Sequence, residues 1–460
     1  MRSRLTSGGV LLLCVVVAGI TNTSMIAAAM VQIGSLLLAC YLAFLGWRGA
    51  DTMRRARGRE PSRGSEAPRL PFVSLVVPAR DEAPVIEAVV RDLASQVYEF
   101  ENAPHFEVLV VDDGSSDRTG SLAREVAAEF GGRVRVIRRE AGDGPATRGA
   151  ALNHATPYAR GSVVAAIDAD ARVPPEFLSN AISSWRWDSN AGAMQVQRRP
   201  VGRNGNWLVG AQADEQLIDM CMQCWRWRTD GNVELRGNGM FIRHDLLERL
   251  GGWGAEALTE DLDTSMRLAA LGERVTLAPE VSIEEQAVAS IRALWQQRMR
   301  WAEGSMRRII SHGPVLIAAP IPLSRKLDFL SLLAQFVFAS LFMASIAYGL
   351  IVSVMSPPAD WAVPLTLLIS FGLGIAPLAW AGLSAGGRRG SSLFAGVLRA
   401  TVFLLHWNLV APAAMIRIAL GPSGIRYVKT VHSVSCVREI NSQLSQTNAQ
   451  PGNGSVQREL

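Results

Sequence analysis

Two aspartates one residue apart, Asp168 and Asp170, directly follow the apolar run 163–167. A strand that ends in this way presents both carboxylates at the carboxyl edge of its sheet. Carboxylate oxygens there suit a hard divalent cation such as Mg²⁺ or Mn²⁺, which is commonly shared with the phosphates of a substrate. Ordinary acidic turns contain the same spacing, so the pair indicates a metal site only together with the other motifs of the chain.

Polar residues also follow the apolar runs 73–77 and 108–111 upstream. The first run ends in a proline and a polar turn, which either only stops the strand or forms a floor for a nucleotide base and ribose. The second ends in Asp-Asp-Gly-Ser, where a carboxylate could accept the N3–H of a uracil ring and so select a uridine nucleotide. Helix capping is the simpler explanation for the serines that follow. The candidate nucleotide-sugar-binding residues in these turns are Pro78, Arg80, Glu82, Asp112 and Asp113.

A glycine-rich stretch, residues 142–150, contains a single cation, Arg148. Its spacing matches neither a P-loop nor a dinucleotide-binding fingerprint. The stretch is either a mobile loop or a contact between Arg148 and a diphosphate.

Two further motifs supply candidates for an acceptor site and a base. In the first, Gly237 precedes Asn238 and a second glycine follows it, which lets the backbone approach a substrate closely. In the second, Thr259 precedes three carboxylates within four positions, among them Glu260 and Asp261. One acidic residue is enough to cap the following helix, so three indicate more than a cap. We predict that Asp261 is the base that deprotonates an acceptor hydroxyl.

The segment 284–312 is rich in Trp, Gln and Arg and is typical of one or two amphipathic helices at a membrane interface. Gln297 and Arg300 lie three residues apart and share a helix face with Trp301. A snorkelling arginine and an interfacial tryptophan would explain the pattern without a catalytic role. The functional interpretation is an arginine clamp on pyrophosphate and an aromatic platform for the acceptor.

The elements that must position these residues follow from the apolar pattern. Short β-branched runs alternate with amphipathic stretches, which predicts βαβ units and a mostly parallel sheet in an α/β fold. Ligands bind beyond the carboxyl ends of such strands, where the motifs fall. The predicted strands are 73–77, 108–111, 134–137, 163–167 and 193–197, and the predicted helices between them are 83–95, 118–130 and 174–187.

Apolar residues make up 49% of the chain and gather at both ends, which predicts a soluble domain anchored by membrane segments. Residues 25–47, 327–355 and 362–384 are long enough to span, because roughly 20 helical residues cross a bilayer. Residues 8–20 either form a hairpin with the next segment or belong to a cleaved signal peptide. Polar residues interrupt 394–420, for which we prefer a re-entrant or interfacial element.

The formal charge of +5 comes mainly from arginines. No basic stripe interleaved with aromatics is present in the sequence, so nucleic acid is not a predicted partner. The arginines between 54 and 69 directly follow an apolar segment, and such arginines stay cytoplasmic and attract anionic lipid. The chain has one CxxC, Cys221 and Cys224, without a second pair, which predicts reduced helix residues rather than a zinc site.

The predicted organisation places the catalytic domain in the cytoplasm between membrane segments. Its parts are an N-terminal transmembrane region (1–50), a basic linker (51–70), the catalytic domain (71–283), amphipathic interface helices (284–325), a transmembrane or re-entrant region (326–420) and a cytoplasmic tail (421–460) with a disordered end.

Taken in order, Asp-Asp-Gly, Asp-x-Asp, Thr-Glu-Asp and Gln-x-x-Arg-Trp resemble the membrane-embedded glycosyltransferases of family 2, from about Val73 to Trp301. The resemblance implies a GT-A fold (a Rossmann-like nucleotide-diphospho-sugar transferase), a UDP-sugar donor that Asp168 helps to bind, Mg²⁺ or Mn²⁺, and inversion at the anomeric carbon. It also implies that Asp261 is the base. Gly237, Asn238, Glu260, Gln297, Arg300 and Trp301 would serve the acceptor and the diphosphate.

Within the family, residues 294–304 and 427–432 look most like the β-monoglucosyldiacylglycerol synthases of cyanobacteria. This implies transfer of glucose from UDP-glucose to diacylglycerol by an integral protein of a bacterial inner membrane or thylakoid. Arg148 stands where lysine is frequent and Tyr427 where tryptophan is frequent, so charge and aromaticity are kept.

Two alternatives stay open. One is a processive synthase of a β-linked polysaccharide of the cellulose, hyaluronan or poly-N-acetylglucosamine type, which shares Gln-x-x-Arg-Trp. The other is a non-catalytic membrane scaffold that binds UDP-sugar, although the intact Asp168, Asp170, Asp261 and Arg300 argue against it.

Overall fold

The structure is a computed structural model, and it describes residues 2–23, 25–58, 70–140, 142–185, 190–203, 205–355 and 361–421. The arginines of the predicted linker beyond residue 58, the segment 427–432 and the predicted disordered tail lie outside the described residues.

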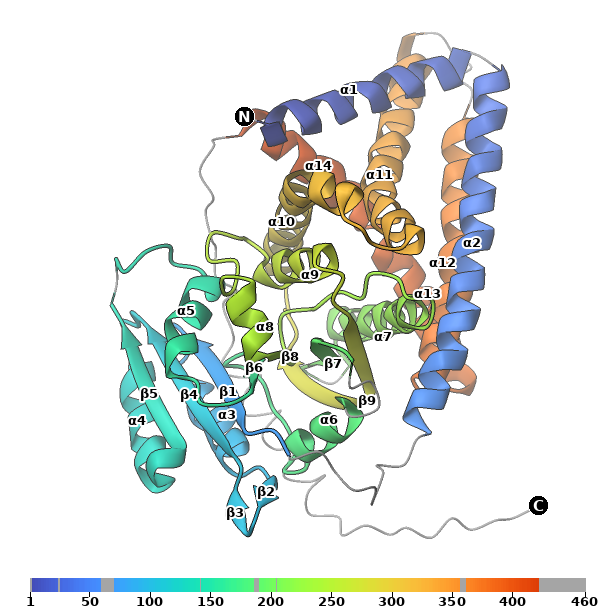
Figure 1. The fold of residues 1–460 in the computed structure, drawn as a ribbon. Helices are drawn as coiled ribbons and strands as arrows, with labels where there is room; N and C mark the ends of the chain where they lie inside the picture. Colours follow the sequence, from blue (N-terminus) through green and yellow to red (C-terminus); the bar gives the residue numbers. More distant parts are fainter. Residues whose placement is uncertain are drawn as a thin grey trace, which may run out of the picture.

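Seven strands form one sheet at the centre of the α/β part (Figure 1): β1 (Val73–Ala79), β4 (Phe106–Asp113), β5 (Val134–Arg139), β6 (Val163–Ala166), β7 (Ala193–Val201), β8 (Met240–Arg243) and β9 (Val275–Gln286). Their order is β5-β4-β1-β6-β8-β7-β9. Only β8 pairs antiparallel with its neighbours, β6 and β7. The predicted strands and the mostly parallel α/β sheet are thereby confirmed. A short hairpin, β2 (Glu99–Phe100) and β3 (Ala103–Pro104), stands apart from it.

Helices cover both faces of this sheet, because its central strands are buried on both sides. One face packs on α3 (Ile86–Ala94), α4 (Thr119–Glu129) and α6 (Phe177–Trp185), which match the three predicted helices. The other face packs on α5 (Arg148–Ala155), α7 (Trp207–Arg228) and α8 (His244–Arg249). The 3₁₀ turns η1 (Gly131–Arg133) and η2 (Thr156–Tyr158) precede β5 and β6.

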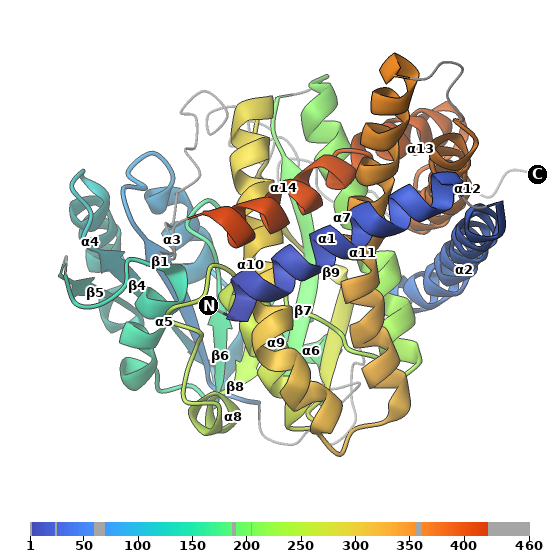
Figure 2. The ribbon, with the colours of Figure 1, turned by 90° about the horizontal axis from the view of Figure 1, so that it is seen from above.

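In the described part of the chain, five segments are long and apolar enough to cross a membrane. They lie in α1 (Arg2–Thr23), α2 (Met25–Arg57), α11 (Leu323–Met355), α12 (Ala362–Ala385) and the consecutive helices α13 (Gly390–Leu404) and α14 (Trp407–Leu420). Helices α2 and α12 run side by side, whereas α1 points in another direction and packs against α11 and α14 (Figures 1 and 2). Helix α1 thus does not lie alongside α2 over its length, as a hairpin of the two segments would require.

The C-terminal apolar run, predicted to be re-entrant or interfacial, is two helices with a break at Leu405 and His406. Helix α13 packs against α7 and α12, while α14 packs against α1, α11 and α10 (Ile291–Ala318). The break thus lets the chain leave the α2–α12 pair and return over the α/β part.

Helix α2 continues beyond its apolar part into the predicted linker and joins the core on one face of the sheet. Its residues Ala50 and Met53 pack in the same cluster as Cys221 and Cys224 of α7. Both cysteines are free and buried, as predicted for helix residues, and burial raises the pKa of Cys221 to about 12. The juxtamembrane Arg57 donates hydrogen bonds to the carbonyls of Pro279 and Ala385, so it also fixes the end of α12.

The amphipathic helix predicted from residue 284 begins later. Residues up to Gln286 belong to β9, which pairs with β7 at residues 275–278 and again, after a bulge, at residues 282–286. Helix α10 starts after Ser290, whose hydroxyl accepts a hydrogen bond from the backbone N–H of Ala293 and caps the helix. Residues 284–286 therefore pair with β7 instead of forming the first turn of the predicted helix.

Candidate active site

One cavity of about 940 Å³ connects the carboxyl ends of β1, β4 and β6 with the apolar helices. These three strands are parallel neighbours, so the turns that follow them meet at the same edge of the sheet. Helices α9 (Glu260–Ala270) and α10 complete the polar part of the wall. The predicted site residues that line the cavity are Pro78, Arg80, Glu82, Asp113, Arg148, Asp168, Asp170, Gly237, Glu260, Asp261, Gln297, Arg300 and Trp301.

Asp168 and Asp170 face this cavity from the turn after β6. The backbone N–H of Asp168 donates to Asn238 Oδ1 at 3.0 Å, and that of Gln286 donates to Asp170 Oδ2 at 3.0 Å. The side chain of Asp168 is 33% exposed, which leaves it accessible to a ligand in the cavity. Both residues are therefore held in place by neighbouring elements rather than by one another.

The donors at this turn fit a divalent cation. They are carboxylate oxygens, which Mg²⁺ and Mn²⁺ prefer. Among the described residues, no group of three or more His, Cys, Asp or Glu side chains is placed to hold an ion. A cation on Asp168 and Asp170 would thus need further ligands from substrate phosphates and water, as Mg²⁺ sites commonly do.

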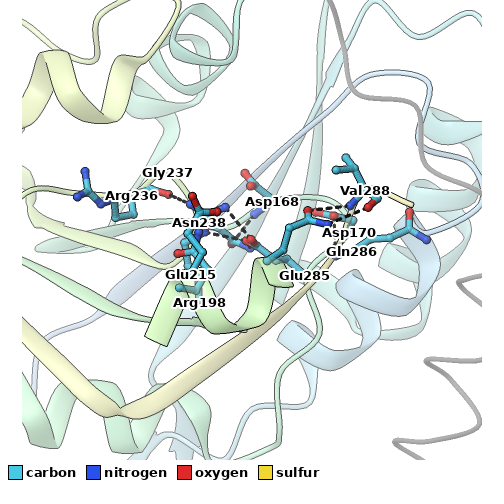
Figure 3. A network of polar contacts seen from close by, with 12 residues as sticks. Asp168, Asp170, Arg198, Glu215, Arg236, Gly237, Asn238, Glu285, Gln286 and Val288 are labelled. Atoms are coloured by element: carbon cyan, nitrogen blue, oxygen red, sulfur yellow. Dashed lines mark hydrogen bonds and ion pairs between the residues drawn. The ribbon is translucent and has the colours of Figure 1, made fainter. Parts of the chain in front are cut away.

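Asn238 is a positioning residue of this turn. It is 1% exposed and does not line the cavity, so the predicted direct contact with substrate does not follow from its position. Its side chain lies between Asp168 and Glu285 (Figure 3), and its amide nitrogen donates to Glu285 Oε2 at 3.2 Å. The preceding Gly237 adopts a positive φ of 84°, which glycine allows at little cost.

Arg148 links the turn after β6 to the motif around Asp261. It is the first residue of α5, and its guanidinium donates to Asp168, to Glu260 and to the carbonyl of Gly237. The hydroxyl of Thr147 caps this helix by accepting from the backbone N–H of Ala150. The glycine-rich stretch therefore leads into an anchored helix, and Arg148 balances two carboxylates at the cavity wall.

Asp261 lies half-buried in the first turn of α9 and faces the cavity. Among the described residues, Thr259 makes no side-chain capping hydrogen bond to this helix. Burial raises the pKa of Asp261 to about 6; the neighbouring carboxylate of Glu260 adds to this shift, and Arg148 and Arg236 oppose it. A carboxylate with such a pKa is a better proton acceptor than an ordinary aspartate and is still ionised at neutral pH.

This pKa predicts the pH dependence of the reaction. A base acts only in its deprotonated form, so kcat/KM, which follows the ionisation of the free enzyme, should rise with pH through the pKa of Asp261 near 6 and then level off. Below this pKa, kcat/KM should fall about tenfold per pH unit. The measurement is kcat/KM over a pH series, and a flat profile between pH 5 and pH 7 (both about one unit from the midpoint) would argue against Asp261 as the base.

Asp112 does not reach the cavity, so the predicted contact with a nucleotide base is not proposed for it. It is fully buried, and its carboxylate accepts from the backbone N–H of Ser115 at 3.1 Å and pairs with Arg138 at 2.6 Å. Its neighbour Asp113 lines the cavity and pairs with the buried Arg139. The two carboxylates therefore differ in role, with Asp112 holding the turn and Asp113 available to a ligand.

Replacing Asp112 by alanine should destabilise the turn. The buried N–H of Ser115 would lose its acceptor, which lowers the free energy of unfolding by about 1–3 kcal/mol. Thermal unfolding of the purified protein measures this loss. Unchanged stability together with weaker UDP binding would instead return Asp112 to the nucleotide site.

Four arginines of the cavity wall were missed in the sequence, namely Arg198, Arg226, Arg236 and Arg298. Arg198 pairs with Glu285 at 2.6 Å, and Arg236 pairs with Asp219 at 2.7 Å. Arg198 follows the predicted strand 193–197, so the rule that located the other strand-end residues would have found it. Asp219 comes from the middle of α7, which lacks such a signal.

Another of these arginines, Arg298, holds Trp301 in place. It is 1% exposed, pairs with Glu215 and stacks on Trp301 at 4.1 Å between the guanidinium carbon and the ring centre. Trp407 of α14 donates from its indole nitrogen to the same Glu215 at 2.8 Å. Trp301 is thus held by a buried arginine that also ties α10 to α7 and α14.

Comparison with known proteins identifies relatives. Residues 68–304 match the profile of a family described as glycosyltransferase like family 2. The β-monoglucosyldiacylglycerol synthase of Synechocystis sp. is 31% identical over 380 residues, which are 79% of this chain and 76% of that protein. The β-monoglucosyldiacylglycerol synthase of Trichormus variabilis is 30% identical over 378 residues, which are 80% of this chain and 77% of that protein.

More distant likenesses also exist. A poly-β-1,6-N-acetyl-D-glucosamine synthase of Staphylococcus aureus is 23% identical over 50% of this chain and 54% of its own. Among solved structures, the mannosyltransferase PcManGT of Pyrobaculum calidifontis, in complex with GDP-Man and Mn²⁺, has a TM-score of 0.56 and 21% sequence identity. The match extends over 85% of this chain and 99% of the mannosyltransferase chain. This likeness confirms the expected GT-A fold.

Proposed function

The chain belongs to glycosyltransferase family 2, and from this premise we propose that it transfers glucose from UDP-glucose to 1,2-diacylglycerol. The product would be a β-monoglucosyldiacylglycerol, formed with inversion at the anomeric carbon. The printed activity of the relatives that cover most of this chain supports the lipid acceptor.

The observation that carries the proposal is the two-sided cavity. Its polar end holds Asp168, Asp170 and Asp261, and its other end lies between α2, α11 and α12. The second end is lined mainly by apolar side chains, which suit acyl chains and not the hydroxyl groups of a glycan. Apolar residues of this wall are Leu38, Leu42, Leu332, Phe336, Phe338, Phe371, Ile375 and Leu378.

In the proposed reaction the free hydroxyl of the lipid lies beside Asp261. The carboxylate takes the hydroxyl proton while the oxygen attacks the anomeric carbon of the sugar. The bond between this carbon and the phosphate oxygen breaks, its electron pair leaves with UDP, and the proton stays on Asp261 until solvent removes it. Trp301, stacked on Arg298, would form one wall of the acceptor site.

Asp168 and Asp170 would hold the divalent cation, which when bound neutralises charge that develops on the departing diphosphate. The positive side chain of Arg300, which also lines the cavity, would add to this stabilisation. The Mn²⁺ complex of the solved mannosyltransferase supports a metal in this fold.

We further propose that the catalytic part faces the cytoplasm. Helix α2 has Arg54, Arg55 and Arg57 in its last turn, where it enters the catalytic part. Arginines at the end of a membrane helix favour the cytoplasmic side.

A product assay tests the proposed function. Purified protein is incubated with labelled UDP-glucose and diacylglycerol, and the reaction is partitioned between chloroform and water. Label in the chloroform phase supports glycolipid synthesis. Label in a water-soluble or insoluble glycan would support the polysaccharide alternative, which has a relative at 23% identity.

The scaffold alternative differs in predicting no turnover. Release of UDP that depends on added diacylglycerol would exclude it. Tight binding of UDP-glucose without release of UDP would support it.

A further inference from the structure

The apolar end of the cavity is closed. Helices α2, α11 and α12 form this end, and on each of them the residues that line the cavity end at about the same depth. The last of them are Ser35 on α2, Ser370 on α12, and Phe338 with its neighbour on α11. Ser35 and Ser370 are 5% and 2% exposed, and their hydroxyl oxygens lie 3.0 Å apart in a hydrogen bond that joins the two helices.

A packed cluster lies one helical turn beyond this level on all three helices. Leu367 of α12 is 1% exposed and Phe342 of α11 is 6% exposed, and Val31 of α2 packs against the same cluster. A turn takes 3.6 residues, so these side chains stand directly past Ser370, Phe338 and Ser35. The cluster therefore blocks the cavity where the serine pair ends it.

The seam between α2 and α12 closes the cavity along its side. A Cβ atom on Gly374 would lie 3.1 Å from the Cα of Ala39, and one on Gly46 would lie 2.8 Å from the Cα of Leu378. Backbones this close leave no room for a chain to pass between the helices. The end of the apolar part and its side along α2 and α12 are thus both defined.

From these contacts we propose that this part is a chamber for one acyl chain of the acceptor, and that Ser35, Ser370 and Phe338 set the longest chain that fits. The inference rests on the proposed function, because the chamber opens into the space that holds Asp261. Seven residues separate Leu42 from Ser35, so this wall of the chamber is about 10 Å deep. A chain longer than the chamber would leave its excess methylene groups outside it, and the lipid would bind less tightly.

The test is the acyl-length profile of kcat/KM for a graded series of diacylglycerols with the full-length purified enzyme. Ser370→Leu fills the end of the chamber and should move the optimum to shorter chains. Each methylene group that no longer fits should lower kcat/KM about fourfold. The change should lie in KM, because acyl contacts are the same in the ground state and the transition state.

Phe338→Ala provides the opposite change and should move the optimum to longer chains. Leu373→Phe is the matched control, because Leu373 lies on the same helix as Ser370 but is 55% exposed on its outer side. A rate loss that is equal for all chain lengths would show a structural effect and overturn the chamber.

The outcomes separate the two claims. Opposite shifts in the two variants with an unchanged control support the chamber. A parent enzyme active on diacylglycerol whose profile ignores both substitutions overturns the chamber and leaves the function. A parent enzyme inactive on every diacylglycerol overturns the function and the chamber with it.

Discussion

Replacing Asp261 by asparagine should lower kcat by about 10²–10⁴-fold, which is the usual contribution of a positioned general base. Asparagine has nearly the same shape and can still accept a hydrogen bond from the backbone N–H of Leu262, as Asp261 does at 2.8 Å. It cannot accept the proton of the lipid hydroxyl. The first turn of α9 should therefore keep its structure while the chemical step is lost.

Initial rates of glycolipid formation measure this effect, and binding of UDP-glucose by calorimetry checks that the donor site survives. Glu256→Gln is the matched control, since Glu256 is an exposed carboxylate in the loop before α9. The remaining activity of Asp261→Asn should also lose the rise in rate near pH 6. An asparagine variant with normal kcat would remove Asp261 from the reaction.

Replacing both Asp168 and Asp170 by asparagine should lower kcat by at least about 100-fold, because the loss of a metal's charge stabilisation is worth several kcal/mol. Neutral amides bind hard cations less well than carboxylates. The single Asp170→Asn variant should recover part of its rate at high Mn²⁺ concentration. Asp168→Asn should recover less, because Asp168 also pairs with Arg148 at 2.7 Å.

Activity as a function of Mg²⁺ or Mn²⁺ concentration after treatment with a chelator measures these effects. Asp245→Asn is the control, since Asp245 is a carboxylate whose side chain is 65% exposed on α8. Full activity of the parent enzyme with all divalent ions removed would contradict a metal role for Asp168 and Asp170.

The polar half of the site could be predicted from the sequence because parallel strands bring their ends together. Asp113 ends β4, Asp168 follows β6 and Arg148 begins α5, and since β4 and β6 lie on either side of β1, all three residues reach the same edge of the sheet although they are far apart in the sequence. Side chains on a strand alternate between its two sides. The sequence did not indicate which of Asp112 and Asp113 faces the cavity, and the structure shows that Asp113 lines it whereas Asp112 is buried.

The apolar half could not be predicted, because it depends on packing between distant segments. Ser35 and Ser370 lie 335 positions apart and meet only through the α2–α12 contact. Every turn of these helices carries apolar residues, so the pattern does not distinguish a side that faces lipid from one that faces a cavity. Glu215 and Asp219 on α7 could not be predicted either, because their roles become clear only from the ion pairs that they form with Arg298 and Arg236.

A photoactivatable diacylglycerol, with its reactive group in an acyl chain, tests whether lipid and donor meet in one cavity. We expect cross-links to cavity residues of α2 and α12 such as Leu42 and Phe371, and glucosylation of the cross-linked lipid when UDP-glucose is added. Cross-links confined to outward residues such as Leu37 and Leu368, which are 66% and 43% exposed, would contradict the account. So would a cross-linked lipid in the cavity that never receives the sugar.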